Sequence, residues 1–288
     1  MNNDLNKKAM LVDLSIRMWL ARKYDKKVTA EVAVAHGTDE DVGRYNKNLL
    51  PIDSPSYDAV RKLGTALRME HYQQTLPWSN EGARILPAAR YVAYMEKMRE
   101  MRAQYDKATS AFLAEYPALR ENSKTALKGM YRDEDYPSEA YIGEHFEVSI
   151  KVFPLPVGDD FRVDLANGTQ SDVQEQITKD TRDAINEAMK EPYRRLHVIV
   201  ARMAERLNDP KAKFKNSLVG NIEELCDILP TLNLTDDPEM AKMTDVVRAK
   251  LGGHDPDVLR KDKKVRKQVA AEASRIESDL AGFMGGGG

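Results

Sequence analysis

The five histidines of this chain belong to the residue type that most often binds metals or moves protons, and they are widely separated. They are His36, His71, His145, His197 and His254. None follows the His-x-x-x-His or His-Glu-x-x-His spacing by which one helix face presents two imidazoles to a metal. His197, with Glu191 and Glu205 nearby in the sequence, is more typical of a partly exposed helix residue than of a ligand or base. No local metal site is predicted, although a site assembled from distant carboxylates stays open.

Motifs for phosphate binding and for nucleophilic catalysis are missing from the sequence. It has no Gly-x-x-x-x-Gly-Lys-Ser/Thr loop, no Gly-x-Gly-x-x-Gly fingerprint after a strand and no Gly-x-Ser-x-Gly elbow. Cys226 is the only cysteine and falls on an apolar stripe, which predicts a buried structural thiol. We therefore expect no cofactor and no enzymatic activity. An enzyme would need His145, Glu144 and Glu147 to converge on a deep pocket with another acid.

Positive charge is concentrated near the C-terminus, in residues 260–267. Six of these eight residues are basic: Arg260, Lys261, Lys263, Lys264, Arg266 and Lys267. Such a run is commonly a face exposed to solvent. The functional alternative is that it contacts a phosphate backbone, and Arg194, Arg195 and Arg202 would enlarge this basic surface if they lie nearby. Because the whole chain carries a net charge of −2, nucleic-acid binding requires this local concentration.

A second candidate surface is a heptad-like seam of large side chains. It consists of Tyr91, Tyr94, Met98, Met101, Tyr105 and Phe112, with Ala108 in register. Alternating steps of three and four residues are typical of left-handed coiled-coil packing. The seam forms either core inside the monomer or a surface for self-association or a partner helix, since tyrosine hydroxyls require partners or solvent.

Hydrophobic periodicity predicts the elements that position these groups. Period-two alternation indicates strands near 12–19, 145–153 and 160–165, the last two forming a hairpin, although 12–19 also fits a helical period. Long helical patterns cover 87–116 and 171–207. The predicted class is α+β, mainly α, with a small three-stranded antiparallel sheet packed against long, partly coiled-coil-like helices.

Proline and glycine divide the chain further. Pro192 lies within the helical pattern over 171–207 and predicts a packing bend or a hinge there. We expect a composite helical domain with the sheet over 5–251, a C-terminal helix over 255–284 and a flexible glycine tail over 285–288.

Composition favours a soluble globular protein of 288 residues, with 42% hydrophobic and 31% charged residues. No apolar run approaches the ~18 residues of a membrane helix, and the first residues lack the apolar core of a signal peptide. The expected location is the cytoplasm, with no membrane partner.

Several short segments resemble an uncharacterised family of proteins from tailed phages and mobile elements, catalogued as a domain of unknown function. The matching segments are Ile16-Arg17-Met18-Trp19 with Ala21-Arg22-Lys23, Val42-Gly43-Arg44-Tyr45-Asn46-Lys47, Leu76-Pro77-Trp78, Leu86-Pro87-Ala88-Ala89, Tyr116-Pro117-Ala118-Leu119, Phe153-Pro154-Leu155-Pro156, Met203-Ala204-Glu205-Arg206-Leu207 with Asp209-Pro210, and Leu229-Pro230-Thr231-Leu232-Asn233-Leu234. The family has no established catalytic residues to carry over to this chain. The resemblance also implies that such proteins are often encoded near ATPases similar to the MoxR and cobaltochelatase types.

The resemblance implies a phage or mobile-element accessory protein. The expected function is a non-catalytic, oligomeric scaffold or adaptor for a MoxR-type AAA+ ATPase, in the cytoplasm of the host cell. The alternative is a nucleic-acid-binding protein of phage DNA recombination or replication, acting through residues 260–267.

Overall fold

The computed structural model describes residues 6–78, 82–161, 163 and 169–285. Helices make up 68% of it and strands 11%, and a small antiparallel sheet packs with long helices. The predicted class, α+β and mainly α, is confirmed.

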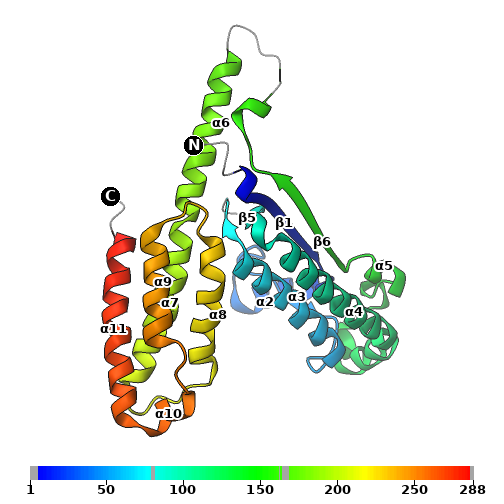
Figure 1. Ribbon diagram of the computed structural model, residues 1–288. Helices are drawn as coiled ribbons and strands as arrows, with labels where there is room; N and C mark the ends of the chain where they lie inside the picture. The colour runs from blue at the N-terminus through cyan, green and yellow to red at the C-terminus, as the bar shows by residue number, and fades with distance from the viewer. Residues whose placement is uncertain (1–5, 79–81, 162, 164–168, 286–288) are drawn as a thin grey trace. The chain divides into compact units, whose positions relative to one another are not determined.

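The elements follow one another along the chain as labelled in Figure 1. In order, they are β1 (Ala9–Arg17), β2 (Arg22–Tyr24), α2 (Lys26–His36), β3 (Asn46–Asn48), α3 (Pro55–Gln74), β4 (Leu76–Pro77), β5 (Arg84–Pro87), η1 (Ala88–Arg90), α4 (Tyr91–Leu127), η2 (Lys128–Met130), η3 (Asp133–Asp135), α5 (Glu139–Gly143), β6 (Glu147–Pro154), η4 (Gly158–Asp160), α6 (Thr169–Ala188), α7 (Lys190–Asn208), α8 (Ser217–Leu232), α9 (Pro238–Leu251), α10 (Pro256–Lys261) and α11 (Lys263–Gly285).

The main sheet has the strand order β4-β5-β1-β6, and β2 pairs with β3 in a separate two-stranded sheet. The strands predicted near 12–19 and 145–153 correspond to β1 and β6. The third predicted strand, over 160–165, is not found where it is described: Asp160 ends η4, and Phe161 and Val163 lie outside any strand. Residues 162, 164 and 165 lie outside the described residues. Instead, β5 pairs with β1, with Val12 opposite Arg84.

Helix α4 begins and ends later than the sequence predicted. Pro87 ends strand β5, so it does not open the helix. Pro117 lies inside α4 and does not end it, although proline removes one helical hydrogen bond. Tyr116 and Leu119, both buried, hold the helix on either side of this proline. Burial of these flanks outweighs the local cost of Pro117.

The helix predicted over 171–207 is two helices, α6 and α7, separated at Met189. Met189 keeps right-handed helical dihedrals, and its amide donates to the Ile185 carbonyl at 3.0 Å, so the chain stays helical between α6 and α7. Pro192, the third residue of α7, has no N–H to donate to the Ala188 carbonyl, and the helical pattern is interrupted there, where the sequence predicted a bend or a hinge. The helix predicted over 255–284 is likewise divided into α10 and α11 at Asp262. The predicted glycine tail begins at Gly285, which ends α11, and residues 286–288 lie outside the described residues.

The chain forms two compact units. Unit 1 consists of Met1–Asp13, Tyr72–Tyr94 and Lys151–Gly288, and unit 2 of Leu14–His71 and Met95–Ile150. Each unit is thus assembled from segments far apart in the sequence.

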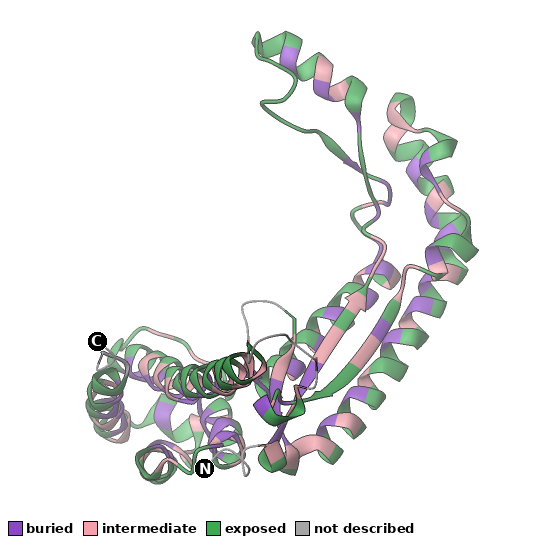
Figure 2. Ribbon diagram, turned by 90° about the horizontal axis from the view of Figure 1, so that it is seen from above, coloured by how far each residue is buried: buried purple, intermediate pink, exposed green. Residues whose placement is uncertain are grey.

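The core of unit 1 is built from α7, α8, α9 and α11, which lie side by side (Figure 1). Leu196, Val200 and Met203 recur at helical spacing along α7 and are buried against the other three helices. Leu218 and Ile222 do the same for α8. The helices accordingly show buried residues on one side and exposed residues on the other (Figure 2).

The core of unit 2 is aromatic. The Trp19 ring lies 6.4 Å from Tyr57, 6.3 Å from Phe112 and 5.7 Å from Tyr116, between ring centroids. Phe146, the residue before β6, packs on Phe112 at 5.7 Å between ring centroids. Such edge-to-face and offset pairs add to the burial of their apolar area.

Unit 2 also contains a buried charged cluster. The Lys47 ammonium lies 2.7 Å from an Asp135 carboxylate oxygen and 3.3 Å from an Asp25 oxygen, and it donates to the Met130 carbonyl at 2.7 Å. Asp25 also caps α2, accepting from the Val28 amide at 3.2 Å. This amide is the main cause of a lowered Asp25 pKa, and Lys47 lowers it further. The cluster ties β3 to α2 and η3.

Replacing Lys47 with methionine should destabilise the protein by about 3–5 kcal/mol, because two buried carboxylates lose their counter-charge. Lys23→Met, at the exposed position opposite Lys47 in the β2–β3 pair, should lower the free energy of unfolding far less.

The pKa of Asp25 in the folded protein lies below its ordinary value of 3.8. The stability that the Asp25 carboxylate contributes is therefore present above that pH and is lost as pH falls through the folded pKa. Urea unfolding across pH 2–6 measures both effects. Equal losses for the two variants would contradict a buried ion cluster.

Candidate nucleic-acid interface

The basic run lies where α10 meets α11, against the loop between α7 and α8. Arg266 connects the two segments. Its guanidinium donates to the main-chain carbonyls of Leu207 (3.0 Å), Arg206 (2.9 Å), Asp209 (2.6 Å) and Ala212 (3.5 Å). The last carbonyls of a helix have no partner within it, so Arg266 closes the end of α7.

Arg260 holds the next part of the same loop. Its guanidinium donates to the Phe214 carbonyl at 3.1 Å and to the Asn216 side chain, and it pairs with Asp257. The Phe214 ring lies beneath both Arg260 and Arg266, at 5.3 and 5.4 Å from the guanidinium carbons. Two of the six predicted phosphate contacts are therefore occupied by the protein's own backbone.

The lysines of this region point to solvent. They are Lys261, Lys263, Lys264 and Lys267 from the basic run and Lys211, Lys213 and Lys215 from the loop. Among the described residues, none of their ammonium groups has an ion-pair partner. Segments 206–216 and 255–267 carry ten Lys and Arg against four Asp, a net charge of +6 in a chain of net −2. We call these seven lysines the lysine-rich end of unit 1.

The carboxylates of this region are mostly engaged in helix caps. Asp262 accepts from the Lys264 and Val265 amides at 2.8 and 3.1 Å, which caps α11. Asp255 caps α10 in the same way. Since these aspartates are turned to the backbone, the lysine ammonium groups dominate the charge presented to a ligand.

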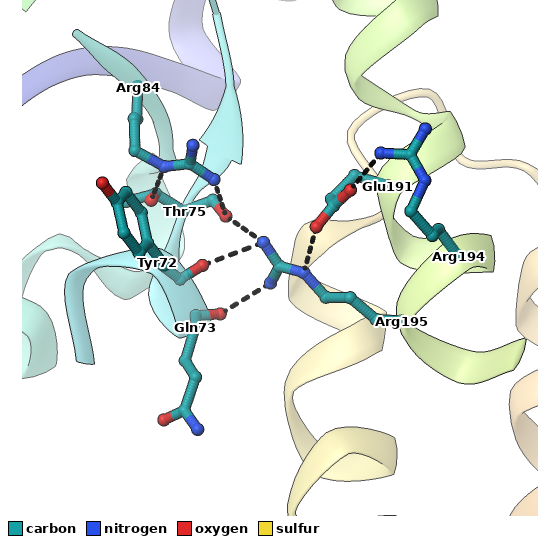
Figure 3. A network of polar contacts seen from close by, with 7 residues as sticks. All are labelled: Tyr72, Gln73, Thr75, Arg84, Glu191, Arg194 and Arg195. Atoms are coloured by element: carbon teal, nitrogen blue, oxygen red, sulfur yellow. Dashed lines mark hydrogen bonds and ion pairs between the residues drawn. The ribbon is translucent and has the colours of Figure 1, made fainter. Parts of the chain in front are cut away.

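Arg195, predicted to extend the basic surface, serves a different purpose. It donates to the carbonyls of Tyr72 (2.8 Å), Gln73 (2.9 Å) and Thr75 (2.7 Å), at the end of α3, and to the Glu191 carboxylate at 3.1 Å (Figure 3). These bonds use all three guanidinium nitrogens. Arg195 is therefore not available to a phosphate.

Arg84 completes the network around Thr75. Its Nε donates to the Thr75 hydroxyl at 2.8 Å, and its guanidinium lies 4.7 Å from the centroid of the Tyr72 ring (Figure 3). Burial lowers the Arg84 pKa, and the nearby charge of Arg195 lowers it further. Two like charges are tolerated because carbonyl oxygens and Glu191 lie beside them.

Arg194 and Arg202 are exposed on α7, and Arg202 lies four residues, or about 6 Å along the helix, before the Arg206 carbonyl that Arg266 binds. Arg194 pairs with Glu191 at 2.9 Å. Arg194 lies twelve residues, or about 18 Å along the helix, before the Arg206 carbonyl that Arg266 binds.

The seam of α4 faces the interior. Tyr94, Met98, Tyr105 and Phe112 are buried, and Tyr91 and Met101 are partly buried. The Tyr105 hydroxyl donates to the Arg17 carbonyl at 3.0 Å, which supplies the partner that a buried phenol requires. The seam is therefore core, and not an exposed surface for a partner helix.

The remaining candidate residues show ordinary structural roles. Cys226 is buried, as predicted, and burial raises its pKa to about 11. His145 donates from Nδ1 to the Tyr141 carbonyl at 2.7 Å and packs on that tyrosine ring. Neither His145 nor the neighbouring Glu144 and Glu147 lines the principal cavities of the described residues.

Two kinds of feature are absent from the described residues. No cluster of three or more histidine, cysteine, aspartate or glutamate side chains there is arranged to hold a metal ion. Within the same residues, every helix is too short or too polar to cross a bilayer.

The loop lysines were missed by the sequence interpretation, although their signal was present. Lys211, Lys213 and Lys215 alternate with Ala212 and Phe214 after the end of a helical pattern. In extended backbone such an alternation turns the three lysines to one side. In the structure all three are exposed, while Ala212 and Phe214 are half-buried. What the sequence lacks is a sign that this segment lies against residues 260–267.

Comparison of the chain with family models, with curated proteins and with solved structures finds no match.

Replacing Arg195 with lysine should lower the free energy of unfolding by about 1–3 kcal/mol, since an ammonium has three donors on one atom and cannot replace the four guanidinium bonds to Glu191 and the three carbonyls. Arg194→Lys is the matched control, one residue away on the same helix, and should change stability by less than about 0.5 kcal/mol. Urea unfolding of both variants measures the difference. Equal stability of the two would show that the network in Figure 3 contributes little.

Proposed function

We propose that this chain is a non-catalytic nucleic-acid-binding protein that contacts the phosphate backbone through the lysine-rich end of unit 1. The observation that supports this function is the local net charge of +6, presented by exposed lysines without ion-pair partners among the described residues. Lysine ammonium groups bind phosphates as point charges, without reading bases. The expected binding is therefore independent of sequence.

The fixed backbone beneath the lysines strengthens the proposal. Arg260 and Arg266 hold the loop against α10 and α11, so the ammonium groups approach a ligand from two attached segments. Less conformational freedom is lost on binding than for a free basic tail.

Changing Lys261, Lys263, Lys264 and Lys267 to alanine should weaken binding of a labelled DNA duplex at least about tenfold at low salt. The slope of log K against log salt should fall by up to about 0.9 for each lysine that contacts a phosphate. Fluorescence anisotropy at several salt concentrations measures both quantities, for duplex and for single strands. Arg266 is left in place because its loss would release the loop.

The matched control removes four exposed lysines elsewhere: Lys23, Lys107, Lys151 and Lys179. This control changes the net charge equally, and its affinity should stay near that of the parent chain. Absence of binding by the parent chain at low salt, or equal weakening by both quadruple variants, would rule out the proposed interface.

We also propose, on the resemblance to phage and mobile-element proteins, that the chain serves as an oligomeric adaptor for a MoxR-type AAA+ ATPase in the host-cell cytoplasm. The proposal is favoured by an exposed groove in unit 2 that is lined by apolar and basic side chains, described below. Co-expression with such an ATPase, followed by size exclusion with and without ATP, tests it. A shared peak is expected, and two independent peaks at micromolar concentration would contradict it.

A further inference from the structure

A groove of about 840 Å³ opens on unit 2, beside α3. Its floor contains the buried residues Ala21, Leu50 and Tyr57. Its sides carry three large apolar residues that are unusually open to solvent: Leu20 is 67% exposed, Ile52 89% and Met69 58%. These three residues come from separate segments of the chain, and exposed apolar side chains gathered in one concave site are typical of binding surfaces.

The backbone at the groove is locally strained. Ala21 adopts a left-handed conformation, with φ of 51°, which costs about 1 kcal/mol or more for a residue with a side chain. Its carbonyl is held by the Leu49 amide at 2.8 Å. The turn lies next to Leu20, so the strained backbone and the exposed apolar side chain occur at the same site.

The charge of the groove is complementary to an acidic ligand. Arg22, Arg61, Lys62 and Arg68 line it, with Asp58 as the single carboxylate. Arg61 and Asp58 pair at 3.2 Å, which leaves three cations in excess. Positions 58, 61, 62, 65 and 69 of α3 all line the groove at helical spacing and extend about 16 Å along the helix.

We infer that this groove binds an acidic amphipathic helix of a partner protein. Leucine-type side chains at helical spacing would cover Leu20, Ile52 and Met69, while carboxylates on the flanks would face Arg22, Lys62 and Arg68. A nucleic-acid strand fits less well, because the exposed side chains of the groove are aliphatic and offer no aromatic stacking platform. The inference does not rest on the nucleic-acid function of unit 1.

Binding of a designed helical peptide tests the inference on the full chain. The probe is a fluorescein-labelled peptide of about four turns, with leucine at helical spacing and glutamate elsewhere. A dissociation constant below about 100 µM is expected by anisotropy, and at least tenfold weaker binding for the same peptide with lysine in place of glutamate. Methyl-labelled methionine spectra should shift at Met18 and Met69, which line the groove, and not at Met243 of unit 1.

Matched variants identify the site. Ile52→Glu should weaken the acidic peptide at least about tenfold. Val34→Glu, at an equally exposed aliphatic position of unit 2 outside the groove, should leave its affinity unchanged. Both positions are exposed, so folding of either variant is not at risk.

Three results would overturn the inference. They are undetectable binding of the acidic peptide, equal affinity for the glutamate and lysine peptides, and unchanged affinity of Ile52→Glu. Displacement of the peptide by a DNA oligonucleotide from both the parent chain and the quadruple lysine variant would identify the groove as a nucleic-acid site and would also overturn the inference.

Discussion

The contacts of Arg266 with the end of α7 determine how the lysine-rich end of unit 1 is built. A helix that ends in a loop leaves carbonyl oxygens without donors, and one guanidinium provides several donors in a fixed plane. Arg266 binds four carbonyls between Arg206 and Ala212, and Arg260 binds the loop two residues further on. The loop is thereby fixed on α10 and α11. Without these bonds, the lysines of the two segments would share no common surface.

Several arginines of this chain bind main-chain carbonyls, whereas most of the exposed lysines that the structure describes do not. Arg195 closes the end of α3, and Arg248 donates to the Cys226 carbonyl at 2.6 Å. The seven lysines of the lysine-rich end are exposed and have no ion-pair partner among the described residues. Lys47 of unit 2 differs from them, since it is buried and neutralises two carboxylates. The division follows from geometry, because a planar fork suits several carbonyls and a single ammonium suits a phosphate or a compact ion cluster.

The sequence predicted the class of fold and the concentration of charge, and it did not predict the partners of each residue. Long periodic patterns such as that of α7 were recognised because burial repeats every three or four residues. Strands β4 and β5 were missed because two to four residues are too few to show alternation. The roles of Arg195, Arg260 and Arg266 had no signal, since their acceptors are main-chain carbonyls that any residue supplies. The groove of unit 2 was equally invisible, because Leu20, Ile52 and Met69 meet only in the fold.

The central claim is that Arg266 stabilises the loop while the neighbouring lysines bind DNA. Measuring the free energy of unfolding and the DNA affinity of the same two variants tests it most directly. Arg266→Lys keeps the charge and removes the multiple carbonyl contacts, so it should lower the free energy of unfolding by about 1–3 kcal/mol. Lys264→Ala removes an exposed charge, so it should leave stability within about 0.5 kcal/mol of the parent chain and weaken DNA binding at low salt. The opposite pattern, a stable Arg266→Lys protein and full DNA affinity in Lys264→Ala, would contradict the account.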